Sequence, residues 1–428
     1  AHNQSRMGKN LWTAGEKGQL IQLYTAFNEQ DEARFIVDQV TQWLDSGRRA
    51  DHCAILYRTT AQSRLFEEYL LRENIPYRVY GGQRFFERTE VKDALAYLRL
   101  MLNPNDDAAL ERVINKPARA IGEKTVSMIR LQARESGLTL WQAANECISQ
   151  GKFATRAGTA VSAFIRLIEG MRERMQDWTL GNQMQGVIDD SNLAAHYEKE
   201  PRERMETRME NLRELVNAAD AFVLPQEDAD AGLSELQSFL SHAALEAGET
   251  QGESWDDCVQ LMTLHSAKGL EFPLVFIVGM EDGLFPHQRS VEDAAGRLEE
   301  ERRLCYVGMT RAREKLYLTY AEIRRMHGSE NFCRPSRFID EIPAEYLEEI
   351  RPRTSSRQPW VSARPAAAMS PDSSNWPFKL GQAVLHPKFG EGTVMSFEGS
   401  GEHTRVHVNF LDVGAKWLVL AYANLQAR

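Results

Sequence analysis

Two segments of the chain carry polar residues in positions that suit chemistry. The polar turn His265–Glu271 lies between two apolar runs, Val259–Leu264 and Leu274–Met280, which have the length and composition of buried parallel strands. Strand ends of open α/β sheets are common ligand sites. A charged stretch, Glu299–Arg303, begins a second segment that ends at Arg311. An arginine in such a place is suited to neutralise charge on a transferring phosphoryl group, so both segments favour a functional interpretation.

Length and composition restrict the class of protein. A chain of 428 residues is too long for one core, so we expect two to four domains. Its 43% hydrophobic and 26% charged residues are ordinary for a soluble globular protein. No apolar run approaches the length of a membrane span, and the polar start AHNQSRMGKN has no signal-peptide core. This start, which lacks an initiator Met, fits a fragment or a processed chain.

Net charge and cysteine usage restrict the cellular compartment and the kinds of binding partner that we expect for this protein. A net charge of −10 argues mildly against a surface that binds nucleic acid everywhere, but it allows a narrow basic channel. The cysteines form no CxxC pair, which favours a reducing cytosol with neither a disulfide framework nor a zinc site. We therefore expect no metal ligands among these five residues: Cys53, Cys147, Cys258, Cys305 and Cys333.

The first eighty residues alternate between strand and helix patterns, which predicts right-handed crossovers and a parallel sheet. Asn28 has the character of a helix N-cap, with Asp31 near the capping-box position, and Gly47 closes that helix. The expected strands are Leu20–Phe27, Cys53–Tyr57 and Tyr77–Tyr80, and the expected helices run from Asn28 to Leu44 and over Ala61–Asn74.

Gly81 and Gly82 break this pattern, and about 170 residues of helical character follow, roughly one domain. The expected helices include Glu90–Leu102, Thr125–Ser136, Leu140–Ile148, Val161–Met175 and Arg204–Phe222, and an acidic loop, Gln226–Asp230, precedes a further one at Leu233–Glu246. Strands resume at Val259 and continue through Lys315–Tyr320, so the helical block is an insertion into an α/β domain.

The C-terminal part changes composition twice. Arg351–Pro377 is rich in Pro, Ser, Ala and Arg, as in a flexible linker. Short alternating strands separated by turns such as Gly399–Gly401 then predict a small SH3-like or Tudor-like barrel; they are Val384–His386, Thr393–Phe397, Arg405–Phe410 and Lys416–Val419. The expected divisions are 1–83 and 257–350 for the α/β domain, 84–256 for the helical insertion, 351–377 for the linker and 378–428 for the barrel.

The stretches TLHSAKGLEF and EEERRLCYVGMTRA resemble motifs V and VI of the UvrD/PcrA/Rep group of superfamily 1 DNA helicases, and the resemblance covers nearly the whole chain. It implies a RecA-like second motor domain, in the C-terminal half of an ATP-dependent helicase of 3′→5′ polarity that acts in DNA repair and replication. ATP and Mg²⁺ are the implied cofactors. The chain contains no GxxxxGK[ST] sequence and no strand that ends in paired acids, so the P-loop half must supply the phosphate cradle and the Mg²⁺ ligands. Alone, the chain should not hydrolyse ATP.

The resemblance assigns nucleotide contacts to three residues. Arg311 is the implied arginine finger, because a guanidinium stays charged and binds phosphate oxygens bidentately; the alternative is a surface ion pair. Glu271 is the implied ribose ligand, against a capping role, and Gly269 serves a backbone conformation. Arg302 and Arg303 either support this pocket or belong, with Glu299–Glu301, to a solvated charged face.

Single-stranded DNA contacts are implied at the other polar positions. His265, Thr263 and Ser266 match the face that touches the DNA backbone, although a lone His after a strand is more often structural. Lys268 either contacts phosphate or completes the turn. Arg58 and Thr60 belong to a segment that matches the family's DNA track, where Thr60 replaces the usual Asn; a hydroxyl also bonds phosphate oxygens.

The helical block begins at a segment that matches YGGxxFFER, in which Gly81 and Gly82 are the expected hinge and Phe85 and Phe86 are expected to pack rather than stack on bases. Further on, Ile121, Gly122 and Lys124 lie where the family grips duplex phosphate through backbone N–H groups at a turn. Ala120 replaces the first Gly of that turn, which leaves the tight turn open to question.

The barrel contains His386, Lys388, Phe389 and Trp417, which match the family's tail module. The implied partners are RNA polymerase or repair factors, and the alternative is a domain whose aromatic residues only fill its own core. Two other functions stay open for the chain: a stand-alone binding or regulatory protein, and a RecB/AddA-type helicase–nuclease subunit, which the absence of an acidic nuclease cluster disfavours. We expect the protein in the bacterial cytosol, at the nucleoid.

Overall fold

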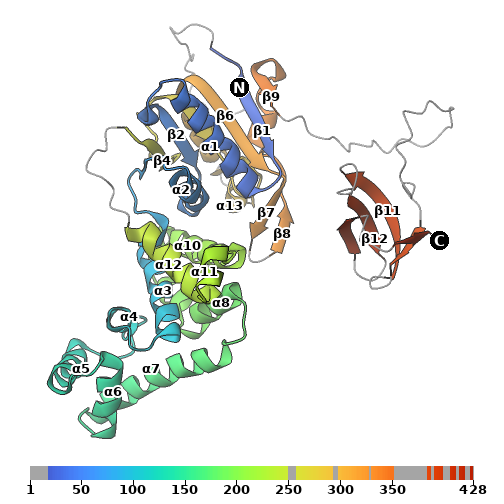
Figure 1. Cartoon of the computed structure of the whole chain (residues 1–428). Helices are drawn as coiled ribbons and strands as arrows, with labels where there is room; N and C mark the ends of the chain where they lie inside the picture. The colour runs from blue at the N-terminus through green and yellow to red at the C-terminus, as the bar shows by residue number, and fades with distance from the viewer. Residues whose placement is uncertain are drawn as a thin grey trace. The chain divides into compact units, whose positions relative to one another are not determined.

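A computed structural model describes residues 18–248, 257–292, 297–326 and 329–350, together with 383–386, 390–398, 405–410, 414–419 and 425–427 in the C-terminal part. The chain forms two compact units, Ala1–Thr354 and Ser355–Arg428 (Figure 1).

The first unit is built on a seven-stranded sheet in the order β3-β4-β2-β5-β6-β1-β9, and every neighbouring pair is parallel. The expected parallel sheet is therefore confirmed. Its strands are β1 (Ile21–Ala26), β2 (Cys53–Tyr57), β3 (Tyr77–Val79), β4 (Val259–Thr263), β5 (Phe272–Ile277), β6 (Ala312–Ala321) and β9 (Leu347–Glu349).

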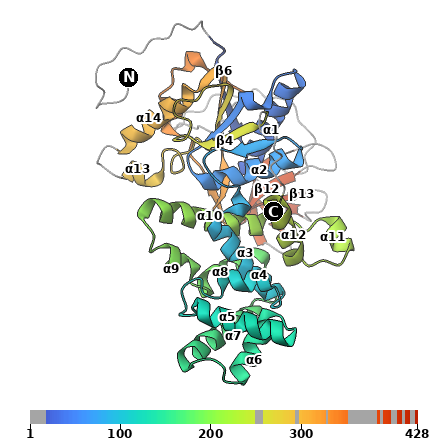
Figure 2. The same ribbon diagram turned by 90° about the vertical axis from the view of Figure 1, so that its left-hand side faces the viewer.

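Helices cover both faces of this sheet. Strand β2 is buried along its whole length, and its side chains alternate between two cores. Ile55 and Tyr57 pack with helices α1 (Glu29–Asp45) and α2 (Ser63–Arg72). Ala54 and Leu56 share the other core with α14 (Arg297–Met309) and α15 (Arg337–Asp340), and Figure 2 shows α14 across the sheet from α1 and α2. This double cover explains why the central strands are continuously apolar.

Helix α1 begins as its sequence predicts. The Asn28 side chain accepts a hydrogen bond from the Asp31 backbone N–H at 2.9 Å, and acidic residues occupy the first turn. The second expected helix is shorter than predicted, because a 3-10 turn, Thr60–Gln62, precedes α2.

A buried carboxylate ties α1 to the sheet. Glu32 is only 1% exposed and accepts from the Gly279 N–H at 2.8 Å and from Thr319 Oγ1 at 2.6 Å. Arg324, on β7 (Ile323–Met326), donates to Glu32 at 2.8 Å and to Glu281 at 2.6 Å. The buried charges are thus paired and hydrogen-bonded, as burial requires. Strand β7 pairs antiparallel with β8 (Ser329–Phe332).

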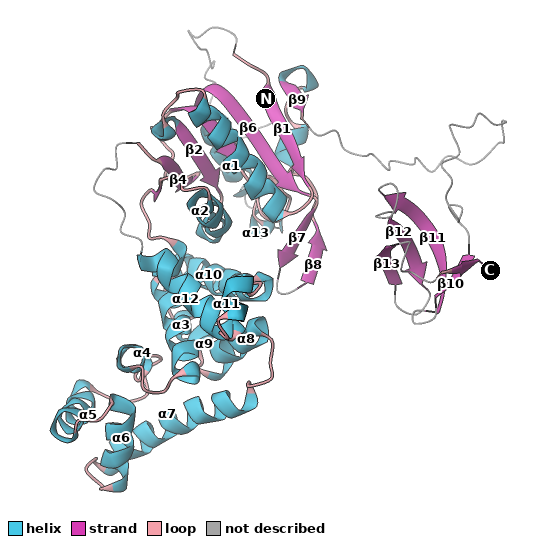
Figure 3. Cartoon of the chain, in the orientation of Figure 1, coloured by secondary structure: helices cyan, strands magenta, loops and turns pink. Residues whose placement is uncertain are grey.

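A helical block lies between β3 and β4 and has its own hydrophobic core (Figure 3). The prediction of an acidic loop at Gln226–Asp230 is wrong, because these residues form the short helix α11. Pro225 stands at its N-cap, and Glu227 and Asp228 in its first turn favour a helix N-terminus. The helices are α3 (Thr89–Leu102), α4 (Asp107–Val113), α5 (Glu123–Ser136), α6 (Leu140–Ser149), α7 (Thr155–Arg174), α8 (Leu180–Asp190), α9 (Leu193–Tyr197), α10 (Arg202–Ala221), α11 and α12 (Glu235–Gly248).

The second unit contains a five-stranded antiparallel sheet in the order β13-β12-β11-β10-β14, with a register shift between Val394 and Ser396. The four expected strands are present, and β14 is additional. Residues 351–377 and 399–401 lie outside the described part. The strands are β10 (Ala383–His386), β11 (Gly390–Glu398), β12 (Arg405–Phe410), β13 (Gly414–Val419) and β14 (Gln426–Ala427). Within the described residues of both units, no helix has the length and apolar character to cross a membrane.

Candidate functional site

The structure places Glu271 and Arg311 at the opposite edge of the sheet from the predicted DNA residues Thr263 and Arg58. Glu271 and Arg311 immediately precede β5 and β6, so they lie at the amino ends of these strands. Thr263 ends β4 and Arg58 follows β2, at the carboxyl ends. Because β4, β2, β5 and β6 are all parallel, the segment Leu264–Glu271 runs from one edge of the sheet to the other.

The Arg311 side chain is fixed by neutral oxygens. Its Nε donates to the Val307 carbonyl at 2.8 Å and its Nη1 donates to the Leu270 carbonyl at 2.7 Å. Its Nη2 donates to Thr310 Oγ1 at 3.0 Å. No carboxylate among the described residues pairs with it, so the surface ion pair considered as the alternative is not formed there. A partly exposed guanidinium whose charge is not neutralised is suited to receive an anion.

Backbone contacts hold Arg311 beside Glu271. The Phe272 N–H donates to the Arg311 carbonyl at 2.8 Å, next to the bond from Arg311 to Leu270. Close packing also holds helix α14, which precedes Arg311, against the residues after β4, because a Cβ on Gly308 would lie 2.4 Å from Leu264 Cδ2. Gly269 has φ +88°, a conformation that favours glycine, as expected.

Glu271 forms an ion pair with Arg313 at 3.0 Å, and both side chains are at least half exposed. Exposed pairs of this kind contribute little and exchange partners easily. The pair therefore leaves the Glu271 carboxylate open to a competing hydroxyl ligand.

At the opposite edge, the residues after β4 form a compact hydroxyl-bearing turn. Thr263 Oγ1 and Ser266 Oγ are 3.0 Å apart, and the Ser266 N–H donates to the Thr263 carbonyl at 3.0 Å. His265 and Lys268 are exposed. Partial loss of water around the His265 ring, with the nearby Arg58 charge, lowers the pKa of His265, so the ring is mostly neutral near pH 7.

Arg58 has a partner that the sequence did not reveal. Its guanidinium donates bidentately to the Glu301 carboxylate, with Nη2 to Oε1 at 2.7 Å and Nε to both oxygens at 3.0 Å. Glu301 is only 5% exposed, so the solvated charged face considered for Glu299–Glu301 is wrong for this residue. Arg302 is likewise engaged, by Glu299 and by Glu341, and these bonds raise the pKa of Arg302.

Three predicted DNA residues come together in one hollow of about 450 Å³. Thr60, Thr263 and Ser266 line it together with the expected hinge residues Gly81 and Gly82 and one face of helix α10. Gly81 has φ +73°, so this position favours glycine. We call this hollow the α10 groove; Arg58, His265 and Lys268 lie outside its lining.

Arg88 joins the helical block to the sheet domain, a role that we did not predict. It donates to the Thr60 carbonyl at 3.1 Å, to Asn211 Oδ1 at 2.8 Å and to Ser63 Oγ at 2.8 Å. Phe85 and Phe86 are buried, which confirms their expected packing role. The run of aromatic and charged residues in FFER was the available signal for such a junction.

The expected duplex-binding turn lies in the helical block, before α5. Ala120 adopts φ +60°, so the left-handed turn forms despite the alanine. Asn115 Oδ1 stabilises it by accepting from the Arg119 N–H at 2.8 Å and the Ile121 N–H at 3.2 Å. The Ile121 side chain is buried, whereas Gly122 and Lys124 are exposed at the helix start.

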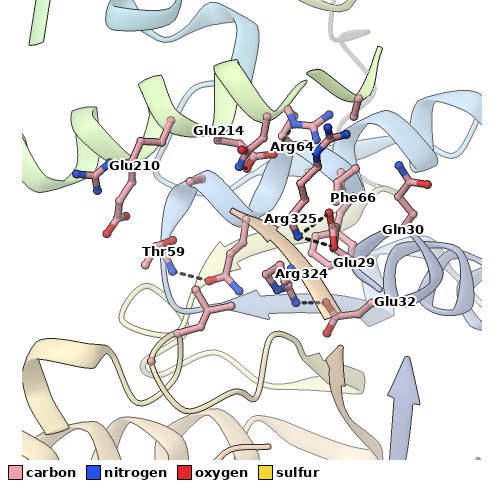
Figure 4. Close-up of a pocket in the computed structure, with 18 of the residues that line it drawn as sticks. Glu29, Gln30, Glu32, Thr59, Arg64, Phe66, Glu210, Glu214, Arg324 and Arg325 are labelled. Atoms are coloured by element: carbon pink, nitrogen blue, oxygen red, sulfur yellow. Dashed lines mark hydrogen bonds and ion pairs between the residues drawn. The ribbon is translucent and has the colours of Figure 1, made fainter. Parts of the chain in front are cut away.

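A second hollow, of about 230 Å³, lies between α1, α2, α10 and β7 (Figure 4). Its charged residues are largely paired: Arg324 with Glu32, and Arg64 with Glu214 at 2.6 Å. None of the predicted nucleotide or DNA residues lines it. Across the residues that the structure describes, no cluster of three or more His, Cys, Asp or Glu is placed to hold a metal ion.

Two protein-family models match this chain, one in each of its two units. A model of the UvrD-like helicase C-terminal domain matches residues 1–323, and a model of the PcrA/UvrD tudor domain matches residues 380–426. Both fit a RecA-like second motor domain and a C-terminal Tudor domain, so the expected fold class is confirmed.

Individual relatives match over almost the whole chain. DNA helicase II of Escherichia coli is 55% identical over 426 residues, covering 100% of this chain and 58% of that protein. DNA helicase II of Haemophilus influenzae is 49% identical, with 100% and 58% covered, and the ATP-dependent DNA helicase PcrA of Bacillus subtilis is 37% identical, with 99% and 59% covered. The chain thus spans less than two thirds of the length of these relatives. It belongs to the UvrD-like helicase family.

Proposed function

We propose that the chain is the second motor half of an ATP-dependent DNA helicase of 3′→5′ polarity, acting in the bacterial cytosol in DNA repair and replication. The observation that carries this proposal is Arg311, a fixed guanidinium without a carboxylate partner among the described residues, beside Glu271. The missing parts are the phosphate cradle and the Mg²⁺ ligands, which a P-loop half supplies.

In this proposal Arg311 approaches the γ-phosphate when the two motor halves close on ATP. Its N–H groups then stabilise charge that develops as the phosphoryl group transfers. Glu271 releases Arg313 and accepts from a ribose hydroxyl, and Gly269 keeps the turn in its left-handed conformation. ATP and Mg²⁺ are bound mainly by the P-loop half.

The segment Leu264–Glu271 couples this chemistry to DNA. It is a short connection between the Arg311 edge and the edge that carries Thr263, so a shift at one end moves the other. Single-stranded DNA contacts the second edge through His265, Thr263, Ser266, Lys268 and Thr60. Arg58 joins them by offering a backbone phosphate the N–H groups that its bonds to the buried Glu301 carboxylate leave free.

The helical block, 84–256 in our proposed division, turns about Gly81 and Gly82 and holds duplex at the start of α5. The Ile121 N–H is bound to Asn115, so the backbone N–H groups from Gly122 onward at the start of α5, with the Lys124 ammonium, form the phosphate contact. The Tudor domain, 378–428, docks a protein partner such as RNA polymerase or a repair factor.

The test is ATP hydrolysis with and without single-stranded DNA, by this chain alone and mixed with a separately expressed UvrD-type P-loop half. We expect DNA-stimulated turnover in the mixture only. Turnover by this chain alone would reveal a phosphate site within it. No turnover by halves that demonstrably associate would instead favour a DNA- or protein-binding regulator.

A further inference from the structure

The α10 groove has features that the assigned DNA residues do not explain. On its sheet side are the hydroxyls of Thr60, Thr263 and Ser266. On its helical side are residues of α10 spaced three or four apart, including Arg204, Thr207 and Asn211, so one face of this helix is turned toward the groove. Tyr80, which directly follows β3, also lines it and remains 40% exposed.

The charges on the helical side are not equivalent. Arg208 is bound to Glu90 at 2.8 Å and to Glu200 at 2.9 Å, so its charge is used within the block. Arg204 is exposed and pairs with no carboxylate among the described residues. Glu203 also lines the groove, which keeps it from being uniformly basic. Of the two α10 arginines that line the groove, Arg204 is therefore the one that is available to an incoming anion.

An exposed aromatic ring beside a cation and several hydroxyls suits single-stranded nucleic acid. Bases stack on such a ring whatever their sequence, while the cation and hydroxyls follow the backbone. Tyr80 is suited to stacking because its N–H donates to the Leu261 carbonyl at 2.8 Å, which fixes its backbone to β4, and its ring remains partly exposed. A hollow of about 450 Å³ lies within the usual range of ~300–1,000 Å³ for small-ligand sites, enough for a nucleotide unit.

We propose that Tyr80 and Arg204 form a base-plus-phosphate subsite for single-stranded DNA, so that helix α10 is part of the single-strand track. This inference rests on the proposed function, because it extends the path of the single-stranded DNA from Thr60, Thr263 and Ser266 into the helical block. Rotation about Gly81, which directly follows Tyr80, then changes the grip on the single strand as well as on duplex.

The test is fluorescence anisotropy of the full chain with a labelled oligodeoxythymidylate of about 16 nucleotides, over a range of salt concentrations. We expect Tyr80→Leu to weaken binding roughly fivefold or more through loss of stacking, while Tyr80→Phe retains it. A plot of log affinity against log salt concentration has a negative slope, and each single-strand phosphate contact contributes about 0.7 to its magnitude. We expect Arg204→Ala to reduce this magnitude by about 0.7 and Arg204→Lys to restore the parent slope.

Two matched controls test whether these effects come from the groove. Arg202 is an exposed arginine on the same helix that pairs with Glu206 at 2.9 Å and does not line the groove. Tyr346 is an exposed tyrosine elsewhere. Arg202→Ala and Tyr346→Leu should bind like the parent chain.

The outcomes separate this inference from the proposed function. If the parent chain binds and the groove variants behave like the controls, the subsite is overturned and the proposed function stands. If Tyr80→Phe binds as weakly as Tyr80→Leu, stacking is refuted. If the folded parent chain binds no oligonucleotide at low salt, both proposals are overturned.

Discussion

Replacing Gly308 by alanine tests how α14 is held in place beside Arg311. A Cβ at this position would lie 2.4 Å from Leu264 Cδ2 and 3.1 Å from Ile277 Cδ1. Both partners belong to the core under the sheet, so the helix must move away from β5 or the core must repack. Gly170, inside helix α7, offers a matched control because a Cβ there meets nothing within 4 Å.

The two substitutions should change stability in opposite directions. Overpacking a core typically costs about 1–3 kcal/mol, and the better helix propensity of alanine returns roughly 0.5–1 kcal/mol. Gly308→Ala should therefore lower the free energy of unfolding by roughly 1 kcal/mol at the middle of both ranges, and by up to about 2.5 kcal/mol. Gly170→Ala gains helix propensity without a steric clash, so it should raise the free energy of unfolding by roughly 0.5–1 kcal/mol.

Urea unfolding compares the midpoints of the three proteins, and native-state hydrogen exchange reports the change at α14 and α7 separately. We expect faster exchange at α14 in Gly308→Ala and slower exchange at α7 in Gly170→Ala. Equal stability of Gly308→Ala and Gly170→Ala would refute the steric clash. The close approach of α14 to the strands would then not be what fixes this helix.

Two further changes test strained or buried positions in the helical block. Ala120→Gly should stabilise the protein by about 1 kcal/mol, because glycine relieves the left-handed conformation at φ +60°; an unchanged urea midpoint would contradict this. Burial, with Glu68 and Glu67 nearby, raises the pKa of Glu246 to about 8, so ionising this carboxyl opposes folding. The contribution of the protonated Glu246 carboxyl to stability is full below about pH 4.5 and is lost as the pH rises through 8. The stability of Glu246→Gln relative to the parent should therefore increase from pH 5 to pH 9. A difference in urea midpoint that stays constant over this range would refute the raised pKa of Glu246.

Local patterns predicted most strands and helices of the first unit, because each is apolar on the face or faces that it buries. Strand β2 was predicted at its observed bounds, and the N-cap Asn28 was identified from its neighbours. The order of strands was not accessible: β1 lies between β6 and β9, far from β2, and long-range pairing decides this. Helix α11 was missed because its acidic composition resembles that of a loop.

The candidate site was predictable in its residues but not in their partners. The resemblance to helicase motifs V and VI brought Arg311 and Glu271 to attention, and the structure holds them together through contacts to Leu270 and Phe272. The pairing of Arg58 with Glu301 joins residues 243 positions apart, so no local pattern reveals it.

The left-handed turn at Ala120 and the placement of α10 depend in the same way on tertiary context. Asn115 stabilises that turn from outside it, through the N–H groups of Arg119 and Ile121. Helix α10 reaches the groove because the whole block packs against the sheet domain through Arg88.

The central claim is that Arg311 completes an ATPase site, and single-turnover hydrolysis in the mixture with a P-loop half tests it most directly. Arg311→Ala should slow hydrolysis by about 10³-fold or more with ATP binding and association of the halves little changed, because the side chain acts on charge in the transition state. Arg174→Ala, at an exposed arginine on α7, is the control and should hydrolyse ATP normally. Hydrolysis by Arg311→Ala at the parent rate would contradict the account.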